Sequence, residues 1–185
     1  MINVFYADIS NLSITNECLN QINSLRKEYV SSITDALRKK QSFFVWKLLE
    51  YALKELGVNS NCGFICNNGK WKLVDNSCFF SLSHSKNVVC VAVSENQLGL
   101  DVEFCSEKII KLRNKFDIGC NLAGDKLIEE LTKFWVKLES KFKLSDDGEF
   151  FSFVIDEEKD SKFVIGVCSK DSDIVLKKID IGNLL

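Results

Sequence analysis

The order of hydrophobic and polar positions changes its period along the chain, and each change marks an expected element. Residues 2–8 alternate in the manner of a β-strand. From about residue 32 to residue 56 the apolar positions recur near helical spacing, and Gly57 follows as a stop signal. This pattern predicts a first strand followed by a long helical region.

Beyond that helix the pattern becomes β-type and then helical again. Short apolar stretches fill residues 63–103, which we interpret as an antiparallel meander. A second helical pattern covers about residues 126–143, and three more strands follow it. Because helices and strands do not strictly alternate, the order favours an antiparallel α+β fold. The expected strands in these regions are 64–66, 71–74, 78–83, 88–93, 98–103, 150–155, 163–168 and 174–178.

Composition places the chain among ordinary globular proteins, since 46% of its 185 residues are apolar and 27% are charged. A formal net charge of −2 provides no positive field for DNA or RNA, so we expect no nucleic-acid partner. Apolar runs such as residues 88–93 have strand length, far below the roughly 20 residues of a membrane helix. We therefore expect no membrane association.

Cysteine usage indicates the compartment. The chain has eight cysteines in no CxxC pair and a single histidine, so the usual spacings of structural zinc sites are missing and support for such a site is weak. Its first residues lack the basic and apolar segments of a signal peptide. These features predict free thiols in a cytoplasmic protein.

Two carboxylates stand out in the expected strand that contains Gly99–Glu103. Alternation along a strand puts Asp101 and Glu103 on the same face. Such a pair is either part of a solvated strand face or a site for a hard cation such as magnesium or manganese. The pattern alone leaves both interpretations open.

A second feature lies in the later helix, where Trp135, Glu139 and Lys143 are four residues apart and share one face. An ordinary Glu–Lys pair at this spacing is one interpretation. A carboxylate and an ammonium group that act together on a ligand are the other.

The third feature is Phe80–Ser85, an apolar strand that ends in hydroxyl groups around His84. The imidazole is either a strand-end residue without a task or a group that holds a phosphate. A Ser/His hydrolase is not supported, because no GxSxG element is present and no acid or oxyanion hole can be assigned.

In sequence order these pieces resemble the signature of the Sfp-type 4′-phosphopantetheinyl transferases of the holo-acyl-carrier-protein synthase superfamily. The matching segments are Phe80–Ser85 (FSLSHS), Gly99–Glu103 (GLDVE) and Trp135–Lys143 (WVKLESKFK), and the resemblance spans roughly residues 40 to 145. It implies two similar halves, each a helix packed on a small antiparallel sheet. Residues 1–104 would carry the coenzyme A and metal ligands, and residues 105–185 the catalytic helix and its sheet.

The resemblance implies transfer of 4′-phosphopantetheine from coenzyme A to a serine of an apo acyl or peptidyl carrier protein, with release of 3′,5′-ADP. A magnesium ion, or manganese in its place, would be held by Asp101, Glu103 and Glu139. Glu139 would also accept the serine proton, and Lys143 would contact the phosphates and assist the leaving group. We expect a monomer, because both halves lie in one chain.

Nucleotide contacts follow from the same resemblance. Ser83 and His84 match the positions that hold the 3′-phosphate of coenzyme A, and Lys70 follows Gly69 in an element placed near the adenine and phosphates. A looser match assigns the nucleotide three further residues, which are Arg38, Lys40 and Ser42.

Two departures from the family pattern keep other functions open. Leu138 stands where a lysine usually precedes the glutamate, and Trp71 replaces a proline after Lys70. A coenzyme A-binding pseudoenzyme and a metal-dependent phosphohydrolase are the alternatives. The first would bind nucleotide without turnover, and the second would release product without a carrier protein.

Overall fold

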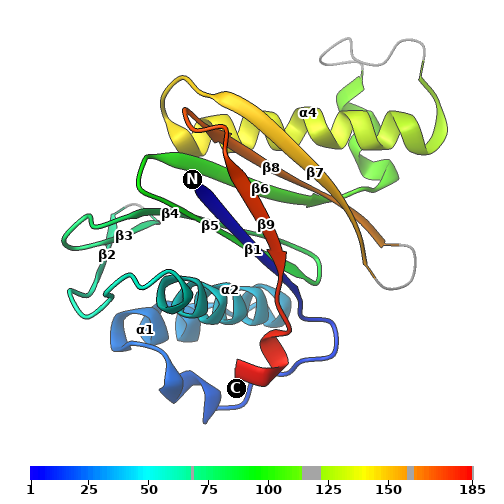
Figure 1. Cartoon of the computed structure of the whole chain (residues 1–185). Coiled ribbons are helices and arrows are strands. Elements are labelled where there is room, and N and C mark those ends of the chain that lie inside the picture. Colours follow the sequence, from blue (N-terminus) through cyan, green and yellow to red (C-terminus); the bar gives the residue numbers. More distant parts are fainter. Residues whose placement is uncertain (68, 114–121, 158–160, 185) are drawn as a thin grey trace.

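The computed structural model describes residues 1–67, 69–113, 122–157 and 161–184. It is a mixed α+β fold in which helix α2 and helix α4 lie on opposite sides of two β-sheets (Figure 1). The α+β class expected from the sequence is therefore confirmed. Within the described residues the helices are α1 (Ser24–Ser32), α2 (Ala36–Glu55) and α4 (Gly124–Leu144), with 3-10 helices η1 (Cys18–Gln21), η2 (Glu107–Leu112) and η3 (Ile181–Leu184).

All of the predicted strands are present. They are β1 (Ile2–Asp8), β2 (Phe64–Asn67), β3 (Lys70–Leu73), β4 (Phe79–Ser85), β5 (Val88–Ser94), β6 (Leu98–Phe104), β7 (Glu149–Glu157), β8 (Ser161–Ser169) and β9 (Ile174–Lys178).

The helical region predicted from about residue 32 to residue 56 corresponds to α2, and α1 before it was not predicted. Helix α1 ends before Ile33, which has extended backbone, and α2 starts after Asp35, whose carboxylate accepts the Arg38 backbone N–H at 2.7 Å. An aspartate at this cap position satisfies one of the N–H groups that a helix start leaves free. Gly57 then ends the region with φ of 68°, as the sequence predicted.

The first sheet has the strand order β4-β5-β1-β9 and carries α2 on one face. Its β1–β9 pair is parallel, whereas β1–β5 and β4–β5 are antiparallel. The expected meander is thus wrong in part. Since β5 already has β1 and β4 as neighbours, no edge of it remains for β6, and β2 and β3 form a separate two-stranded sheet.

The second sheet has the order β6-β8-β7, and α4 packs against it. Leu100 and Val102 of β6 lie in a core shared with Val4 and Cys90 of the first sheet. Alternation along the strand directs Asp101 and Glu103 to the opposite face, toward α4. The two sheets therefore meet through an apolar core, and the carboxylates lie outside it.

Close contact between α4 and β6 depends on Gly99. A Cβ atom at this position would overlap with the Ser140 carbonyl oxygen and would lie 2.6 Å from the Leu144 backbone nitrogen. Only a glycine leaves room for helix backbone at such short range. This contact brings the segment with Glu139 and Lys143 against the acidic strand.

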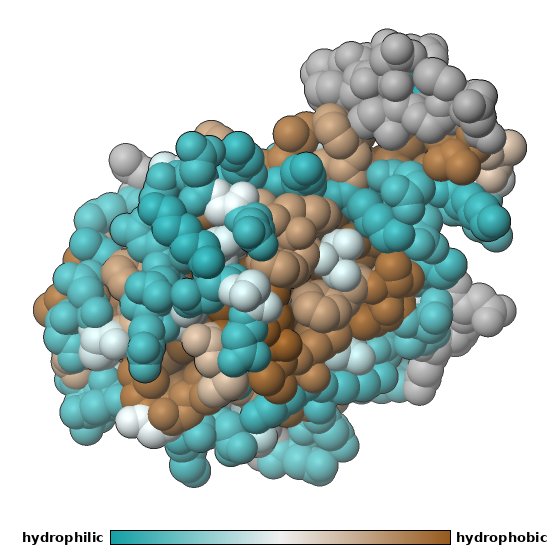
Figure 2. All heavy atoms as spheres, turned by 45° about the horizontal axis from the view of Figure 1, so that its top comes forward, coloured by the Kyte–Doolittle hydropathy of each residue, from teal (hydrophilic) through white to brown (hydrophobic). Residues whose placement is uncertain are grey.

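Some apolar side chains lie on the surface of the protein. Figure 2 shows a face on which exposed apolar residues lie among polar ones, and the exposed apolar side chains include Leu138 and Phe142 of α4. The cysteines of the described residues are free, as expected, and Cys120 lies outside those residues. Within the described part of the chain, no helix combines the length and the apolar character needed to cross a bilayer.

Candidate active site

Strands β4 and β6 lie edge to edge and are joined through serine hydroxyls. Ser81, Ser83 and Ser85 accept the backbone N–H groups of Leu100, Val102 and Phe104 at 3.1, 3.2 and 3.1 Å. Each pair advances by two residues on both strands, so the two strands run parallel. We call this contact between the three serines and residues 99–104 the serine seam.

Two of these serines also hold the carboxylates of β6. The Ser83 hydroxyl donates to Asp101 Oδ1 at 2.8 Å, and the Ser85 hydroxyl donates to Glu103 Oε2 at 2.8 Å. Asp101 is only 5% exposed, and the hydrogen bonds from its neighbours offset the cost of burying its polar side chain. The seam therefore fixes both the strand and the two acids that the sequence singled out.

Lys143 reaches this cluster from α4. Its ammonium group donates to Asp101 Oδ1 at 2.8 Å, to the Leu100 carbonyl oxygen at 2.9 Å and to the Ser83 hydroxyl at 3.3 Å. The lysine thus pairs with the buried aspartate, and the ion pairs seen among the described residues include none between Lys143 and Glu139. Of the two interpretations of the helix face, the structure does not form the simple Glu–Lys pair.

Glu139 is half-buried on the same helix and acts on the cluster through its charge. Burial raises the pKa of Glu103, and the negative charges of Asp101 and Glu139 raise it further. The Ser85 hydrogen bond and the Lys143 charge act in the opposite direction. A carboxyl group in this environment gains from any cation that shares its space.

The donor set was tested for its fit to a divalent metal ion. Among the described residues, no three or more His, Cys, Asp or Glu side chains already form a metal-binding group. Asp101 Oδ2, however, is buried and has no hydrogen-bond partner among those residues, while Oδ1 is fully used. An unpartnered carboxylate oxygen beside Glu103 and Glu139 suits a hard cation such as magnesium.

A separate polar cavity of about 260 Å³ lies at the start of α2. It brings together Arg38, Ser42 and His84, with Tyr29 and Asp35 also in its wall. The side chains of His84 and Ser83 lie on opposite faces of β4, because successive residues of a strand point to opposite faces. The structure therefore places His84 in this cavity but directs the Ser83 hydroxyl to Asp101, so the two residues predicted to share one phosphate lie in different surroundings.

His84 is an exposed residue, yet its pKa is lowered. Partial desolvation is the main cause, and the positive charges of Lys143, Arg38 and Arg26 add to it. An anion in the cavity would reverse the charge effect and favour the protonated ring.

Arg26 is a feature that the sequence reasoning missed. Arg26 is 3% exposed, and its guanidinium group donates to the Ser42 carbonyl oxygen at 2.7 Å and to the Ser42 hydroxyl at 2.9 Å. The rings of Tyr29, Trp46 and Trp71 lie within 4.8 to 5.0 Å of it, and burial lowers the pKa of Arg26 to about 10. Arg26 thus fixes Ser42 and contributes positive charge beside the cavity.

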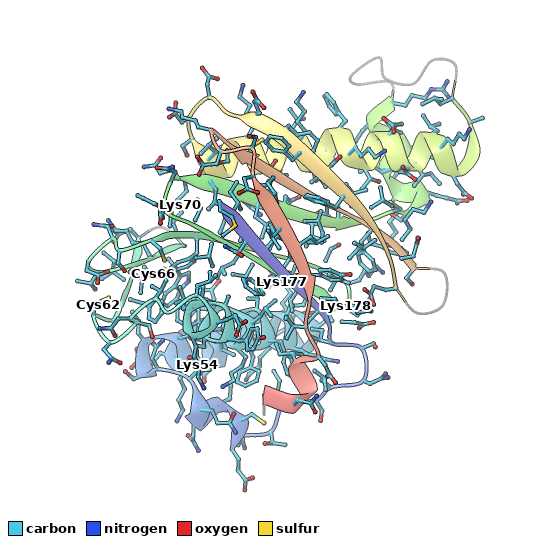
Figure 3. The ribbon with its side chains drawn as sticks, viewed as in Figure 1. Lys54, Cys62, Cys66, Lys70, Lys177 and Lys178 are labelled. Carbon is cyan, nitrogen blue, oxygen red and sulfur yellow. The ribbon has the colours of Figure 1, made fainter. Side chains whose placement is uncertain are left out.

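The remaining predicted nucleotide residues lie apart from this cavity. Lys40 donates to the Ser10 carbonyl oxygen at 3.1 Å on another face of α2. Lys70 donates to the Ser145 hydroxyl at 3.1 Å and, with Trp71 and Lys143, lines a larger cavity of about 630 Å³. Figure 3 shows Lys70 well separated from Lys177 and Lys178 on β9.

The seam could have been found from the sequence in part. Serines at alternate positions of a strand share a face, and Ser81, Ser83 and Ser85 follow this rule. The local pattern does not show which strand these serines contact.

A scan against family models finds no matching family, and a search of curated proteins finds no match.

Proposed function

We propose that the protein is a magnesium-dependent 4′-phosphopantetheinyl transferase of the Sfp type. The observation that carries this proposal is the assembly of three separate sequence motifs around one point. The acids of β6, the hydroxyls of β4 and Lys143 of α4 are joined by direct hydrogen bonds, with Glu139 near enough to influence Glu103. The fold is interpreted in the same way, as two halves that each pack a helix on a sheet.

Asp101, Glu103 and Glu139 are the residues that would hold the metal ion. When bound, a divalent ion would neutralise charge on the coenzyme A pyrophosphate. Asp101 Oδ2 supports this assignment, since it is a buried oxygen of the cluster without a hydrogen-bond partner among the described residues.

The transfer exchanges a phosphoanhydride bond of coenzyme A for a phosphoester bond on the carrier protein. The carrier serine oxygen forms a bond to the β-phosphorus of coenzyme A, while the bond from that phosphorus to the oxygen of 3′,5′-ADP breaks. Glu139 accepts the serine proton, and the departing oxygen keeps the electron pair of the broken bond. Lys143, whose side chain is 30% exposed, offers positive charge to the phosphates as the leaving group departs.

The polar cavity at the start of α2 is the proposed site of the 3′-phosphate. Arg38 and His84 would bind it directly, Ser42 would donate its hydroxyl hydrogen, and Arg26 would hold Ser42 in place. The larger cavity beside Lys70 and Lys143 would accept other parts of the coenzyme. Both cavities adjoin β4, whose opposite faces carry the seam and the histidine.

The proposal is tested by chromatographic detection of 3′,5′-ADP after incubation with coenzyme A and magnesium, with and without an apo carrier protein. A transferase releases the nucleotide only when the carrier is present. Release without a carrier would instead identify a phosphohydrolase. Binding of coenzyme A with no release in the presence of several acyl and peptidyl carriers would indicate a pseudoenzyme and would reject the proposal.

A further inference from the structure

The serine seam has a chemical regularity that the proposed reaction does not by itself require. In Ser83 and in Ser85 the hydroxyl accepts a backbone N–H of β6 and donates to the carboxylate one residue before that N–H. Thus Val102 N–H, Ser83 and Asp101 form one chain of hydrogen bonds, and Phe104 N–H, Ser85 and Glu103 form another. In each chain, the backbone N–H of β6 binds the hydroxyl oxygen, and the hydroxyl proton is donated to a carboxylate of the same strand.

From this regularity we infer that Ser83 and Ser85 are positioning residues that orient the carboxylates of Asp101 and Glu103 toward a divalent cation. The inference deepens the proposed function and rests on its metal site. It differs from the phosphate contact first expected for Ser83, and it gives Ser85 a role that the sequence did not suggest.

The number of bonds at Ser83 supports this role. A serine hydroxyl has one donor and two acceptor sites. At Ser83 the donor bonds Asp101, and the acceptors receive Val102 N–H and Lys143. With the hydroxyl fully used, its position and that of Asp101 Oδ1 are both fixed, and Asp101 Oδ2 is left without a hydrogen-bond partner among the described residues.

Ser85 holds the second acid in the same way. Its hydroxyl donates to Glu103 Oε2 at 2.8 Å and accepts the Phe104 N–H at 3.1 Å, so this oxygen of Glu103 is held in place by the strand that carries it. Removal of such outer partners typically weakens metal binding by about 10- to 100-fold.

The chain contains its own control for a purely structural role. Ser81 accepts Leu100 N–H at 3.1 Å, the same distance as Ser85 to Phe104 N–H, but the residue before Leu100 is Gly99, which has no carboxylate. Ser81→Ala and Ser85→Ala therefore remove equivalent links between the strands. Only the second removes a contact to an acid.

The test measures binding of Mn²⁺ alone to the whole protein by the electron paramagnetic resonance signal of the free ion, without coenzyme A or carrier. Ser85→Ala and Ser83→Ala should each weaken Mn²⁺ binding by about tenfold or more. Ser81→Ala should stay within about twofold of the wild type, and Ser85→Thr, which keeps a hydroxyl, should recover most of the affinity. Thermal unfolding without Mn²⁺ checks that each of these variants is folded.

A second arm tests whether Ser85 acts through Glu103. In the Glu103→Gln background, Ser85→Ala should cause no further loss of Mn²⁺ affinity. Equal Mn²⁺ binding by the wild type and Ser85→Ala, or an equal loss in Ser81→Ala, would overturn the inference. Absence of Mn²⁺ binding by the wild type would overturn it together with the metal site. A protein with the expected binding pattern but no transfer to carriers would support the inference and reject only the proposed reaction.

Discussion

The two helix-on-sheet layers differ in what they bury. Helix α2 meets the first sheet through large apolar side chains such as Phe43, Phe44 and Trp46, each fully buried. Helix α4 approaches β6 through Gly99 and the backbone of Ser140, and it inserts an ammonium group beside a buried carboxylate. One layer resembles an ordinary core, whereas the other accepts polar burial, as functional sites commonly do.

The largest expected effect is the loss of stability on substitution of a core residue in the apolar layer. Trp46→Ala should lower the free energy of unfolding by roughly 3–5 kcal/mol, because it leaves a cavity in the core and removes a ring from Arg26. Phe142→Ala on α4 is the control, since that side chain is 75% exposed and should change stability by less than about 0.5 kcal/mol. Chemical denaturation measures both, and equal losses would contradict the division into two kinds of layer.

The next largest effect is a loss of transfer activity on substitution of an acid in the polar layer, in a variant that still folds. Asp101→Asn should reduce transfer by about 10²- to 10³-fold, because an amide cannot provide the charge that holds a cation. The substitution keeps the shape of the side chain but removes the charged partner of Lys143, so the melting temperature should fall while far-ultraviolet circular dichroism shows a folded protein. Initial rates of holo-carrier formation provide the measurement, and wild-type rates in this variant would refute the assigned metal site.

Gly99→Ala should move α4 away from β6 and so tests the close contact of the polar layer. The added methyl group meets helix backbone, which cannot rotate away, so a loss of about 1–3 kcal/mol in stability is expected. A shift of α4 should also reduce transfer more than stability alone explains, since misplacement by about 1 Å can cost roughly 100-fold in rate. Gly57→Ala tests a different glycine, where φ of 68° strains the backbone but no atom lies near an added Cβ. That variant should retain its transfer rate.

The smallest effect concerns pH and the cavity of His84. With its pKa lowered, His84 is largely neutral at pH 7.5 in the free protein, and a bound phosphate favours the protonated ring. Coenzyme A binding should therefore take up a proton and strengthen by up to about tenfold as the pH falls from roughly 8 to 6. Titration calorimetry in buffers of different ionisation enthalpy measures this uptake.

His84→Gln is the control for that titration. It should bind coenzyme A more weakly at pH 6 and lose most of the proton uptake. In the free wild-type protein, a lowered folded-state pKa means that stability falls as the pH drops through the ordinary imidazole range near 6.5, and the variant should lack that loss. Proton uptake unchanged in His84→Gln would contradict the assignment of this residue to the anion.

Local patterns predicted the elements but not their partners. Residues 2–8 and 88–93 gave correct strands because alternation and apolar runs follow from the strand geometry itself. The parallel contact of β1 with β9 depends on residues more than 170 positions apart, which no periodicity contains. Helix α1 was also missed, and α2 begins after Asp35 instead of near residue 32, although Asp35 has the residue type of a helix cap.

In the candidate site, too, local patterns predicted the direction of side chains along a strand but not contacts between distant segments. Asp101 and Glu103 were correctly placed on one face of a strand, and the opposite directions of Ser83 and His84 could have been read from the same alternation. The contact of Lys143 with Asp101 and the burial of Arg26 were not predictable, because each depends on packing between distant segments. Whether Asp101, Glu103 and Glu139 hold a metal ion stays a prediction.

The measurement that tests the account most directly is the intact mass of an apo carrier protein after incubation with this protein and coenzyme A. The account predicts a mass gain of one phosphopantetheine group with magnesium present, and no gain after chelation with EDTA or with Asp101→Asn. An unmodified mass for every acyl and peptidyl carrier tried, in the presence of magnesium and bound coenzyme A, would contradict it.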